Sequence, residues 1–453
     1  MWGYTVAGIM SELTTTPSEL KRALTPLHLW AIGVGLVISG EYFGWNYGWG
    51  VAGTGGFLLA TLVITLLYVT LVFSLTELAT MIPRAGGPFA YSYRGLGPVG
   101  GLIAGYAAAI EFLLATPAIA AALGAYLHFL HPSIPVLGSA IACYAILTGI
   151  NLLGIQEAAW LALVITLLAI VELLVYMALV APSFETATFA QYAMPYGWHG
   201  VLAALPFAMW LYVCIEGLAV VAEEAKDPAR TVPRGYLSAI LTLVLLAFGV
   251  VILTAGVGDP RKLAAIDYPL LAALASVLGS EHGLTRLFAG IGLFGLIASF
   301  NGIIIAYSRQ IFALARAGYL PGWLAHVSKR RQVPHAALIA GGLFGVAALC
   351  AGRTDQLVVL SVLGAVVMYI CSLVTLFVLR RREPELARPY AVPFYPWCPL
   401  IALVLSCLTL GAIVYYNPRL SALFFGMLTL AVAVFVVARK ARGVTAAAAA
   451  DIA

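Results

Sequence analysis

Residues 33–45 read GVGLVISGEYFGW, and this stretch decides how the rest of the chain is interpreted. It lies in an apolar run from Leu27 to Val51, long enough to cross a bilayer, which takes about 20 residues. Two glycines, Gly40 and Gly44, flank Glu41 near the middle of that run. Glycine-rich backbone at membrane depth is tolerated where it lines a protein cavity, and an ionisable side chain there is costly and usually functional. The stretch therefore predicts an interrupted membrane helix that carries a functional carboxylate.

The composition of the chain is that of a membrane protein. Of its 453 residues, 62% are hydrophobic and only 9% are charged, and the mean hydropathy is +1.00. A soluble domain carries about 25% charged residues, so most of this chain is expected to lie in a lipid bilayer. Its apolar runs are continuous over about 20 residues, whereas a membrane β-barrel alternates polar and apolar residues in segments of about ten. We therefore predict an all-α polytopic membrane protein.

Twelve apolar windows predict twelve transmembrane helices. The windows are 27–51, 54–82, 97–130, 134–153, 156–181, 201–222, 234–257, 284–307, 335–352, 355–379, 397–416 and 418–438. The flanking segments, 1–26 and 439–453, are expected to be short cytoplasmic tails. The first of them lacks a cationic region before an apolar core, so no cleaved signal peptide is predicted.

Basic residues divide unequally between the two sides of the membrane that these windows define. With the N-terminus inside, 19 lysines and arginines fall on the cytoplasmic side, and five fall on the opposite side: Arg261, Lys262, Arg286, Arg353 and Arg419. Because cytoplasmic loops carry the excess of basic residues, both termini are predicted to be cytoplasmic, most simply in a bacterial inner membrane. The net charge of +5 is then a topology signal, and no nucleic-acid partner is predicted.

The predicted membrane interior contains acids and no bases. Four glutamates lie in the central parts of spans, namely Glu41, Glu111, Glu172 and Glu216. An interior of this kind attracts cations and repels anions. The alternative is that some of these carboxylates are protonated, or bonded structurally to backbone and hydroxyl groups. For Glu172, alone on the fifth span, the two interpretations are equally good.

A second interrupted helix is predicted at residues 206–217, which read PFAMWLYVCIEG. It again combines a proline, a glycine and a carboxylate in an apolar run. Breaks in spans one and six are expected of transporters built from two inverted repeats of five helices. The predicted repeats are therefore 27–181 and 201–379, with 397–438 as peripheral helices. Half-helices of this kind point their ends at a central cavity, which makes backbone groups at the breaks candidate ligands: Ser39, Gly40, Val213 and Cys214.

Five motifs in order resemble the amino acid–polyamine–organocation (APC) transporter superfamily. They are the glycine-rich first span, PRAGGPFAY at 83–91, EEAKDPARTVPR at 223–234, the segment from SRQ at 308–310 to LP at 320–321, and RPY at 388–390. The resemblance covers nearly the whole chain. It implies a leucine-transporter-like fold, with a 5+5 inverted repeat, broken helices one and six and two peripheral helices. It also implies secondary active transport.

Within that superfamily, residues 38–46 and 210–217 look most like the ethanolamine permease group. Amino-acid transporters of the superfamily usually read Gly-x-Gly at the first break, where bare amides receive the substrate carboxylate. Here Ser39, Gly40 and Glu41 occupy those positions, so an acid replaces the second glycine. An acid there repels a substrate carboxylate and attracts an amine. We therefore predict import of a small cationic amine by alternating access, with ethanolamine favoured and choline an alternative.

The candidate substrate-binding residues combine carboxylates with aromatic faces, because each cation–π contact contributes about 0.5–2 kcal/mol. They are Glu41, Tyr42, Trp45, Glu111, Phe207, Trp210, Tyr212 and Glu216. The resemblance implies a role for Trp210, which aligns with the tryptophan that packs on substrate in arginine/agmatine exchangers. Trp45 is explained equally well as a membrane-interface residue. Glu111 is either a second anion for the amine or a carboxylate bonded to a broken-helix amide.

The identity of a coupling ion stays open between H⁺ and Na⁺. Some proton-coupled relatives carry a lysine on helix five, and the fifth span here has none. Candidate coupling residues are Glu111, Glu172 and Ser299. Glu77, near the end of span two, is expected to belong to an inner gate or a surface pair with Arg84.

Two other functions remain as alternatives. One is an amino-acid or polyamine permease or exchanger of the same superfamily, and the other is a transporter-like amine sensor. An enzyme is not predicted, because we find no nucleophile–base pair, metal-ligand cluster or phosphate-binding loop. The six cysteines lack metal-ligand spacing, and neither a metal nor a cofactor is predicted.

Overall fold

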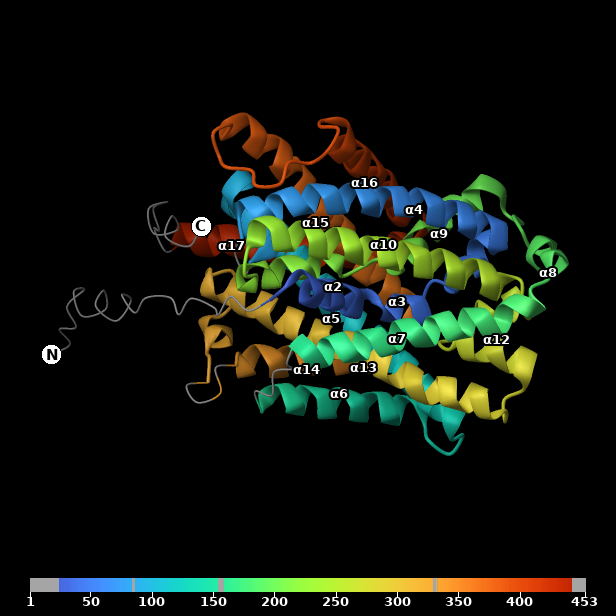
Figure 1. The fold of residues 1–453 in the computed structure, drawn as a ribbon. Helices are drawn as coiled ribbons and strands as arrows, with labels where there is room; N and C mark the ends of the chain where they lie inside the picture. Colours follow the sequence, from blue (N-terminus) through green and yellow to red (C-terminus); the bar gives the residue numbers. More distant parts are fainter. Residues whose placement is uncertain (1–23, 84–85, 154–158, 329–330, 332, 442–453) are drawn as a thin grey trace.

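The computed structural model describes residues 24–441, apart from 84–85, 154–158, 329–330 and 332. Within these residues the regular elements are helices. In addition, Leu24 and Ala225 form one isolated β-bridge. With the labels of Figure 1, the helices are α2 (Pro26–Val37), α3 (Ser39–Tyr42), α4 (Tyr47–Met81), α5 (Gly87–Leu130), α6 (Val136–Leu152), α7 (Ala159–Val180), η1 (Ala181–Ser183), α8 (Thr186–Gln191), α9 (Gly197–Trp210), η2 (Ile215–Glu224), α10 (Pro228–Ala255), α11 (Pro260–Leu263), α12 (Pro269–Leu278), α13 (Gly283–Arg316), η3 (Gly322–Ala325), α14 (His335–Ala351), α15 (Thr354–Arg382), α16 (Trp397–Tyr416) and α17 (Pro418–Ala441).

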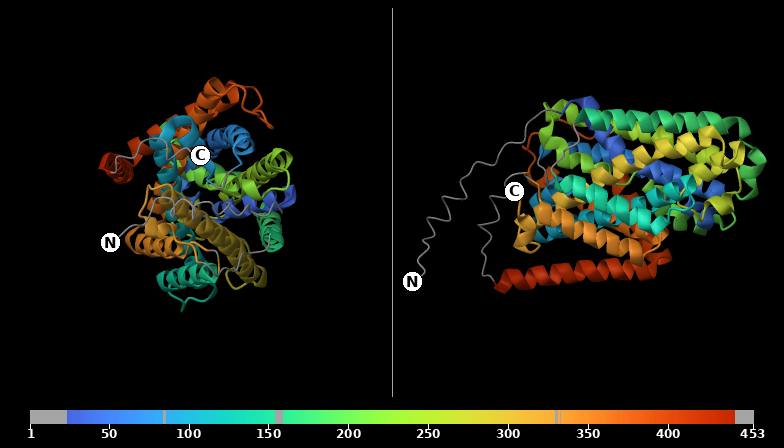
Figure 2. Two further views of the ribbon diagram at one scale, coloured as in Figure 1. Left: turned by 90° about the vertical axis from the view of Figure 1, so that its left-hand side faces the viewer. Right: turned by 90° about the horizontal axis from the view of Figure 1, so that it is seen from below.

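The long helices run side by side and form a bundle with two distinct ends (Figure 1). Helix α2 begins and α17 ends at the left-hand end in Figure 1. We call this the basic end, because α15 finishes there with three arginines, Arg380, Arg381 and Arg382. The opposite end holds α8 and α12 and is called the far end. Viewed along the bundle, α6, α16 and α17 lie on its outside (Figure 2).

The expected polytopic helical architecture is confirmed. In the described part of the chain, nine helical segments are long and apolar enough to cross a membrane, and they coincide with nine of the twelve predicted spans. The other three predicted spans coincide with the shorter apolar helices α2, α6 and α14. Helices α6 and α14 have 17 residues each, at the lower limit of about 17–25 residues for a transmembrane helix.

Two glycines mark span boundaries inside helices that are otherwise continuous. Gly53 has φ +72°, so the first residues of α4 belong to span one and the rest of α4 forms span two. Gly97 has φ +76° and separates the start of α5 from span three. Glycine tolerates these left-handed conformations because it lacks a Cβ atom. These two kinks coincide with the predicted boundaries at 51–54 and at 97.

Span three and the broken span six lie at the centre of the bundle. The most apolar window of α5 is 100% buried and that of the α9–η2 segment is 94% buried, against 17% for α17. Small residues allow this close packing: a Cβ on Gly364 of α15 would lie 2.4 Å from the carbonyl oxygen of Ala107 in α5. Membrane helices pack most closely where such small residues face each other.

The break in span one is double. Helix α2 ends at Val37, the single-turn helix α3 follows at 39–42, and residues 43–46 form a turn before α4. Gly44 in this turn has φ +92°. Glu41 therefore lies in one helical turn between two interruptions, rather than within one simple break.

The break in span six is later than the sequence indicated. Helix α9 runs through Pro206 and ends at Trp210, so the proline does not interrupt it. Proline is tolerated within membrane helices because neighbouring groups satisfy the backbone that it frees. The interruption consists of residues 211–214 and ends at Cys214, which has φ +74°. Glu216 then lies in the first turn of η2.

Candidate functional site

The two interrupted spans touch at Gly40. A Cβ atom on Gly40 would lie 2.3 Å from the carbonyl oxygen of Trp210, so α3 rests directly on the end of α9. Only a residue without a Cβ permits this approach. Gly40, predicted as a backbone residue of the site, is thus located where the first break meets the second.

Glu41 is completely buried in α3. Its amide donates to the Ile38 carbonyl oxygen at 3.0 Å, and its own carbonyl oxygen accepts from Trp45 Nε1 at 3.0 Å. Neither carboxylate oxygen of Glu41 makes a hydrogen bond to a described residue. Burying an unpaired charge is strongly unfavourable, so this carboxylate is available to a cationic ligand.

Trp210 lies beside Glu41's helical turn, against the first break. Its ring meets Phe43 edge-on at 5.7 Å, and a Cβ on Gly44 would lie 2.3 Å from its Nε1 atom. The Nε1 atom makes no hydrogen bond to a described residue. The structure therefore brings Trp210 to the break that carries Glu41, and its role in binding substrate stays a prediction.

Trp45 is enclosed by other aromatic residues. It is completely buried, meets Trp49 edge-on at 4.9 Å and stacks on Phe57 at 6.1 Å. This packing excludes the alternative that Trp45 is exposed at a membrane interface. Its ring supports the turn after α3, and its indole nitrogen is already bonded to the Glu41 carbonyl.

Two other predicted aromatic residues, Phe207 and Tyr212, are held by residues outside the break of span one. Phe207 packs on Tyr47 at 6.0 Å. The hydroxyl of Tyr212 lies 2.7 Å from Thr65 Oγ1, and its ring packs on Tyr68 at 5.1 Å. Both rings therefore have protein partners in this structure.

Glu111 and Glu216 meet around the break of span six. One ligand atom each of Glu111, Cys214 and Glu216 lies within 4.8 Å of the others, and all three residues are buried. The Cys214 amide donates to Glu111 Oε1 at 3.2 Å, which is the structural alternative that the sequence left open. The other predicted backbone group, the Val213 amide, bonds the Met209 carbonyl oxygen at 3.0 Å. Two carboxylates this close repel each other as anions and are compatible with a shared proton or cation.

Two tyrosines that sequence analysis missed complete this acidic cluster. The Tyr369 hydroxyl donates to Glu216 Oε2 at 2.8 Å and lies 3.2 Å from the Tyr68 hydroxyl. Both tyrosines are completely buried in long apolar helices. A hydroxyl within an apolar run was the available signal, but the sequence does not reveal which carboxylate such a group faces.

Tyr42 and Glu172 form a separate pair. The Tyr42 hydroxyl donates to Glu172 Oε2 at 2.7 Å, and the Tyr42 ring meets Tyr126 edge-on at 6.4 Å. Tyr42 is thus engaged with α7 and α5 rather than with the neighbouring Glu41. For Glu172 this contact matches the interpretation of a carboxylate bonded to a hydroxyl.

Ser39 and Ser299 join the first break to α13. Their hydroxyl oxygens lie 2.8 Å apart, and the Ser299 hydroxyl donates to the Leu36 carbonyl oxygen at 2.7 Å. This contact places three oxygen atoms together at the end of α2. Oxygen atoms are the ligands that hard cations prefer, although these three also satisfy one another.

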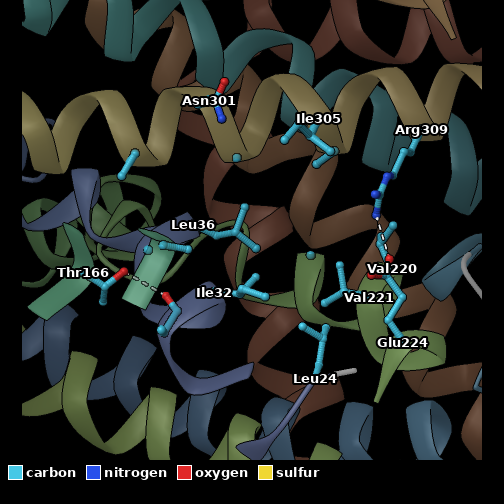
Figure 3. Close-up of a pocket in the computed structure, with 17 residues that line it drawn as sticks. Leu24, Ile32, Leu36, Thr166, Val220, Val221, Glu224, Asn301, Ile305 and Arg309 are labelled. Carbon is cyan, nitrogen blue, oxygen red and sulfur yellow. Dashed lines mark hydrogen bonds and ion pairs between the residues drawn. The ribbon is translucent and has the colours of Figure 1, made fainter. Parts of the chain in front are cut away.

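A pocket of about 470 Å³ lies between the breaks and the basic end (Figure 3). It is lined mainly by apolar side chains of α2, η2 and α13, including Ile32, Val221 and Ile305. Partly exposed Glu224 and Arg309 also line it and form an ion pair at 3.5 Å. Glu41 does not line this pocket.

Leu36 lines the pocket beside the first break. Cβ atoms on Gly217 and Gly302 would lie 2.8 Å and 3.0 Å from its methyl carbons. Leu36 is therefore held between η2 and α13, just before the first interruption. This side chain lines the pocket at the level of the first break, and nothing in the sequence indicates that role.

Glu77 belongs to a buried ionic cluster at the basic end. Arg380 donates to both of its carboxylate oxygens at 2.8 and 2.5 Å, Arg388 lies 3.6 Å away, and the Val392 amide donates to it at 2.7 Å. The expected partner, Arg84, lies outside the described residues. Because Glu77 is completely buried, the interpretation as a surface pair is wrong.

Comparison with known proteins identifies the family. Residues 24–438 match the model of the amino acid permease family. The chain belongs to this family. The resemblance to the APC superfamily is thereby confirmed, and the chain is an amino acid permease-type transporter with multiple membrane spans.

Three relatives illustrate the range of the family. The chain is 31% identical over 433 residues to an uncharacterised transporter of Rhizobium meliloti (strain 1021), covering 91% of this chain and 92% of the relative. It is 24% identical to the branched-chain amino acid permease BcaP of Bacillus subtilis (strain 168), covering 88% and 89%. It is 25% identical to the methylthioribose transporter of the same organism, covering 85% and 87%. The names of these relatives cover different substrates, and the ethanolamine assignment stays a prediction.

Proposed function

We propose that this permease imports a small protonated amine, of the size of ethanolamine or choline, by alternating access around the two breaks. The observation that carries the proposal is the carboxylate of Glu41. It is completely buried between two helix interruptions, and both of its oxygens lack a hydrogen bond to the described residues. A cationic substrate is the partner that removes the cost of burying this charge.

The other buried glutamates support the choice of Glu41. Glu77 is paired with arginines, Glu111 accepts from the Cys214 amide, Glu172 accepts from Tyr42 and Glu216 accepts from Tyr369. Each of these four has a protein partner, whereas Glu41 has none among the described residues. The primary cation site is therefore assigned to Glu41, with Trp210 and Phe43 as the aromatic face beside it.

The second candidate function is transport of an amino acid. Its support is the similarity to BcaP, the branched-chain amino acid permease of Bacillus subtilis. An amino acid brings a carboxylate as well as an amine, and Glu41 repels that carboxylate as long as it is ionised. A sensor that binds an amine without moving it has no specific observation in its favour.

The remaining assignments follow from the same proposal. The basic end faces the cytoplasm of a bacterial cell, residues 27–181 and 201–379 form the two inverted repeats, and 397–438 is peripheral. Transport is coupled to H⁺ or Na⁺. The acidic cluster of Glu111 and Glu216, the carboxylate of Glu172 and the hydroxyl of Ser299 are the candidate coupling groups, because they lie around the breaks and not at the surface.

Uptake of radiolabelled ethanolamine into proteoliposomes tests the proposal. Glu41→Gln keeps the size of the side chain and removes its charge, so we expect uptake to fall about 100-fold or more, since losing one partner of a buried charge pair costs about 2–5 kcal/mol. The matched control is Glu281→Gln, the same change at an exposed position, which we expect to leave uptake unaltered. Undiminished uptake by the Glu41→Gln protein contradicts the proposal.

Competition separates the two candidate functions. Unlabelled choline or ethanolamine should displace the labelled amine, and leucine at the same concentration should not. Strong inhibition by leucine, together with its own uptake, favours the amino-acid permease. The measurement uses the unmodified protein, so it does not depend on how any variant folds.

A further inference from the structure

The far end of span one is covered by residues 259–268, which we call the α11 segment. It consists of α11 and the residues that follow as far as Tyr268. It lies against the start of α4, where a Cβ on Gly50 would be 3.8 Å from the Cβ of Ala264. Tyr268 also packs on Phe129 at the end of α5, with ring centres 5.8 Å apart. The segment thus closes over the far side of the first break.

Asn46 links the α11 segment to the break. Its Oδ1 atom accepts from the Gly44 amide at 2.9 Å, and its Nδ2 atom donates to the carbonyl oxygens of Leu263 at 2.7 Å and Ile266 at 2.9 Å. Asn46 is completely buried. A carboxamide is needed for this pattern, because one end must accept and the other must donate twice.

A second contact fastens the same segment. Asp267 accepts hydrogen bonds from the hydroxyls of Tyr47 at the start of α4 and Thr354 at the start of α15. Asn46 and Tyr47 are adjacent in the chain, and Asn46 belongs to the turn between α3 and α4. The segment is therefore bonded to the turn that follows Glu41 and not only to the outside of the bundle.

We propose that Asn46 is a positioning residue that holds the α11 segment closed as a lid over the far-side route to Glu41. A change in the backbone conformation of Gly44 moves the Asn46 carboxamide through its Oδ1 atom. The carbonyl oxygens of Leu263 and Ile266 then lose the hydrogen bonds that Asn46 Nδ2 donates. The conformation of the first break and the position of the lid then change together. The lid's role in transport rests on the proposed function, whereas its attachment through Asn46 does not.

A reporter disulfide tests the attachment. Gly50→Cys with Ala264→Cys places two Cβ atoms at about the 3.8 Å separation typical of disulfides, in a protein whose exposed Cys350 and Cys407 are replaced by serine. With Asn46 present we expect rapid oxidation to the disulfide. With Asn46→Asp or Asn46→Ala we expect oxidation about tenfold slower, because the carbonyls of Leu263 and Ile266 lose their donors.

The matched control is Asn417→Asp, the same chemical change between α16 and α17. It should leave the oxidation rate of the reporter unchanged. Thermal unfolding of each purified protein excludes global misfolding as the cause of a slower rate. An oxidation rate unaffected by both Asn46 variants overturns the proposal.

Transport by the same reporter tests the lid. We expect the oxidised protein to lose ethanolamine uptake and to regain it on reduction, whereas equal uptake in both states overturns the lid. In Asn46→Ala without the reporter cysteines, maximal uptake should fall about tenfold while KM stays within about threefold, because Asn46 positions the lid and does not touch substrate. If the reduced reporter carries no ethanolamine at all, the proposed substrate fails, and the oxidation rates still decide the role of Asn46.

Discussion

The two ends of the broken spans are closed by different kinds of contact. At the far end, side chains of Asn46, Tyr47 and Thr354 donate hydrogen bonds to the α11 segment. At the basic end, Leu36 lines a pocket of about 470 Å³. The ion pair of Glu224 and Arg309 lines the same pocket. Polar contacts therefore fasten the α11 segment at the far end, whereas the pocket at the basic end adjoins the first break at the apolar side chain of Leu36.

This difference indicates which end is nearer to opening. Hydrogen bonds are directional, so the α11 segment must lose several of them together before it moves. The apolar contact of Leu36 has no such directional requirement, and a partly exposed ion pair contributes about 0–1 kcal/mol. Several directional bonds therefore hold the α11 segment at the far end, whereas an apolar contact of Leu36 lies between η2 and α13 at the pocket of the basic end. With the basic end in the cytoplasm, as proposed, the end nearer to opening is the inner one.

Among the changes that probe the two ends, the largest effect is expected from Gly40→Ala, which disturbs the contact between the two breaks. The new Cβ would lie 2.3 Å from the Trp210 carbonyl oxygen, and a backbone atom cannot turn aside as a side chain does. Overpacking costs about 1–3 kcal/mol, so we expect uptake to fall about 10- to 100-fold. Proteoliposome uptake measures the effect.

Gly149→Ala provides the control for that change. Gly149 lies in α6, and a Cβ on it has no neighbouring atom within 4 Å. Because alanine is the better helix former, this variant should be as stable as the native protein or slightly more stable. If the Gly40→Ala and Gly149→Ala proteins transport equally well, transport does not require the close contact between Gly40 and the Trp210 carbonyl.

A smaller effect is expected from Leu36→Ala, which removes the apolar contact at the basic end. Removing the side chain should connect the pocket to the break and expose Cys214, which is completely buried in the native protein. In a background with Cys214 as its single cysteine, we expect a water-soluble thiol reagent to modify it roughly tenfold faster, since a Leu→Ala change in a packed site costs about 2–5 kcal/mol. Leu36→Met, which nearly conserves volume, is the control and should keep the slow rate.

An unchanged rate of Cys214 modification in Leu36→Ala shows that Leu36 does not shield Cys214 from the pocket. Mass spectrometry follows the modification directly. The polar contacts of the α11 segment are intact in this variant, so a faster rate is due to the change at the basic end alone.

The sequence predicted the helices and which two spans are interrupted, because both depend on local composition. Continuous apolar runs, Gly40 beside Glu41 and the acid at Glu216 are visible without a structure. The partners of the polar groups were less accessible, because Tyr369 is 153 residues from Glu216 and Ser299 is 260 residues from Ser39. Such pairings depend on how distant helices pack against each other.

The same reasoning explains the roles that were missed. Leu36 is an ordinary residue of an apolar helix. Its position between η2 and α13 depends on Gly217 and Gly302, which are distant in the sequence. Asn46 directly follows the stretch 33–45, but its bonds to Leu263 and Ile266 require a fold that brings the α11 segment over it. The proline of span six was misleading for the opposite reason, because a local signal was overridden by the surrounding packing.

The smallest effect concerns the pH dependence of the far end. Asp267 lies in the α11 segment, and its burial raises its pKa above the ordinary value; Asp355 nearby also raises it, whereas the hydrogen bonds from Tyr47 and Thr354 lower it. Asp355 is itself paired with Arg353 at 3.1 Å. A carboxyl whose pKa is raised on folding binds its proton more tightly in the closed segment than in the open one. Its contribution to the closed state is therefore complete below the ordinary pKa and is lost as the pH rises through the raised pKa.

Asp267→Asn should remove this dependence, because an amide resembles the protonated acid and does not titrate. We expect the thermal midpoint of the native protein, relative to that of Asp267→Asn, to fall as the pH is raised from about 4 to about 8, with an effect below about 1 kcal/mol because Asp267 keeps some contact with water. Asp259→Asn, at the N-cap of α11, is a matched change in the same segment. A difference that instead grows in favour of the native protein with rising pH means that the ionised form, bonded to Tyr47 and Thr354, is the one that closes the far end. The polar closure would then strengthen in alkali, and the far end would be the one that opens on acidification.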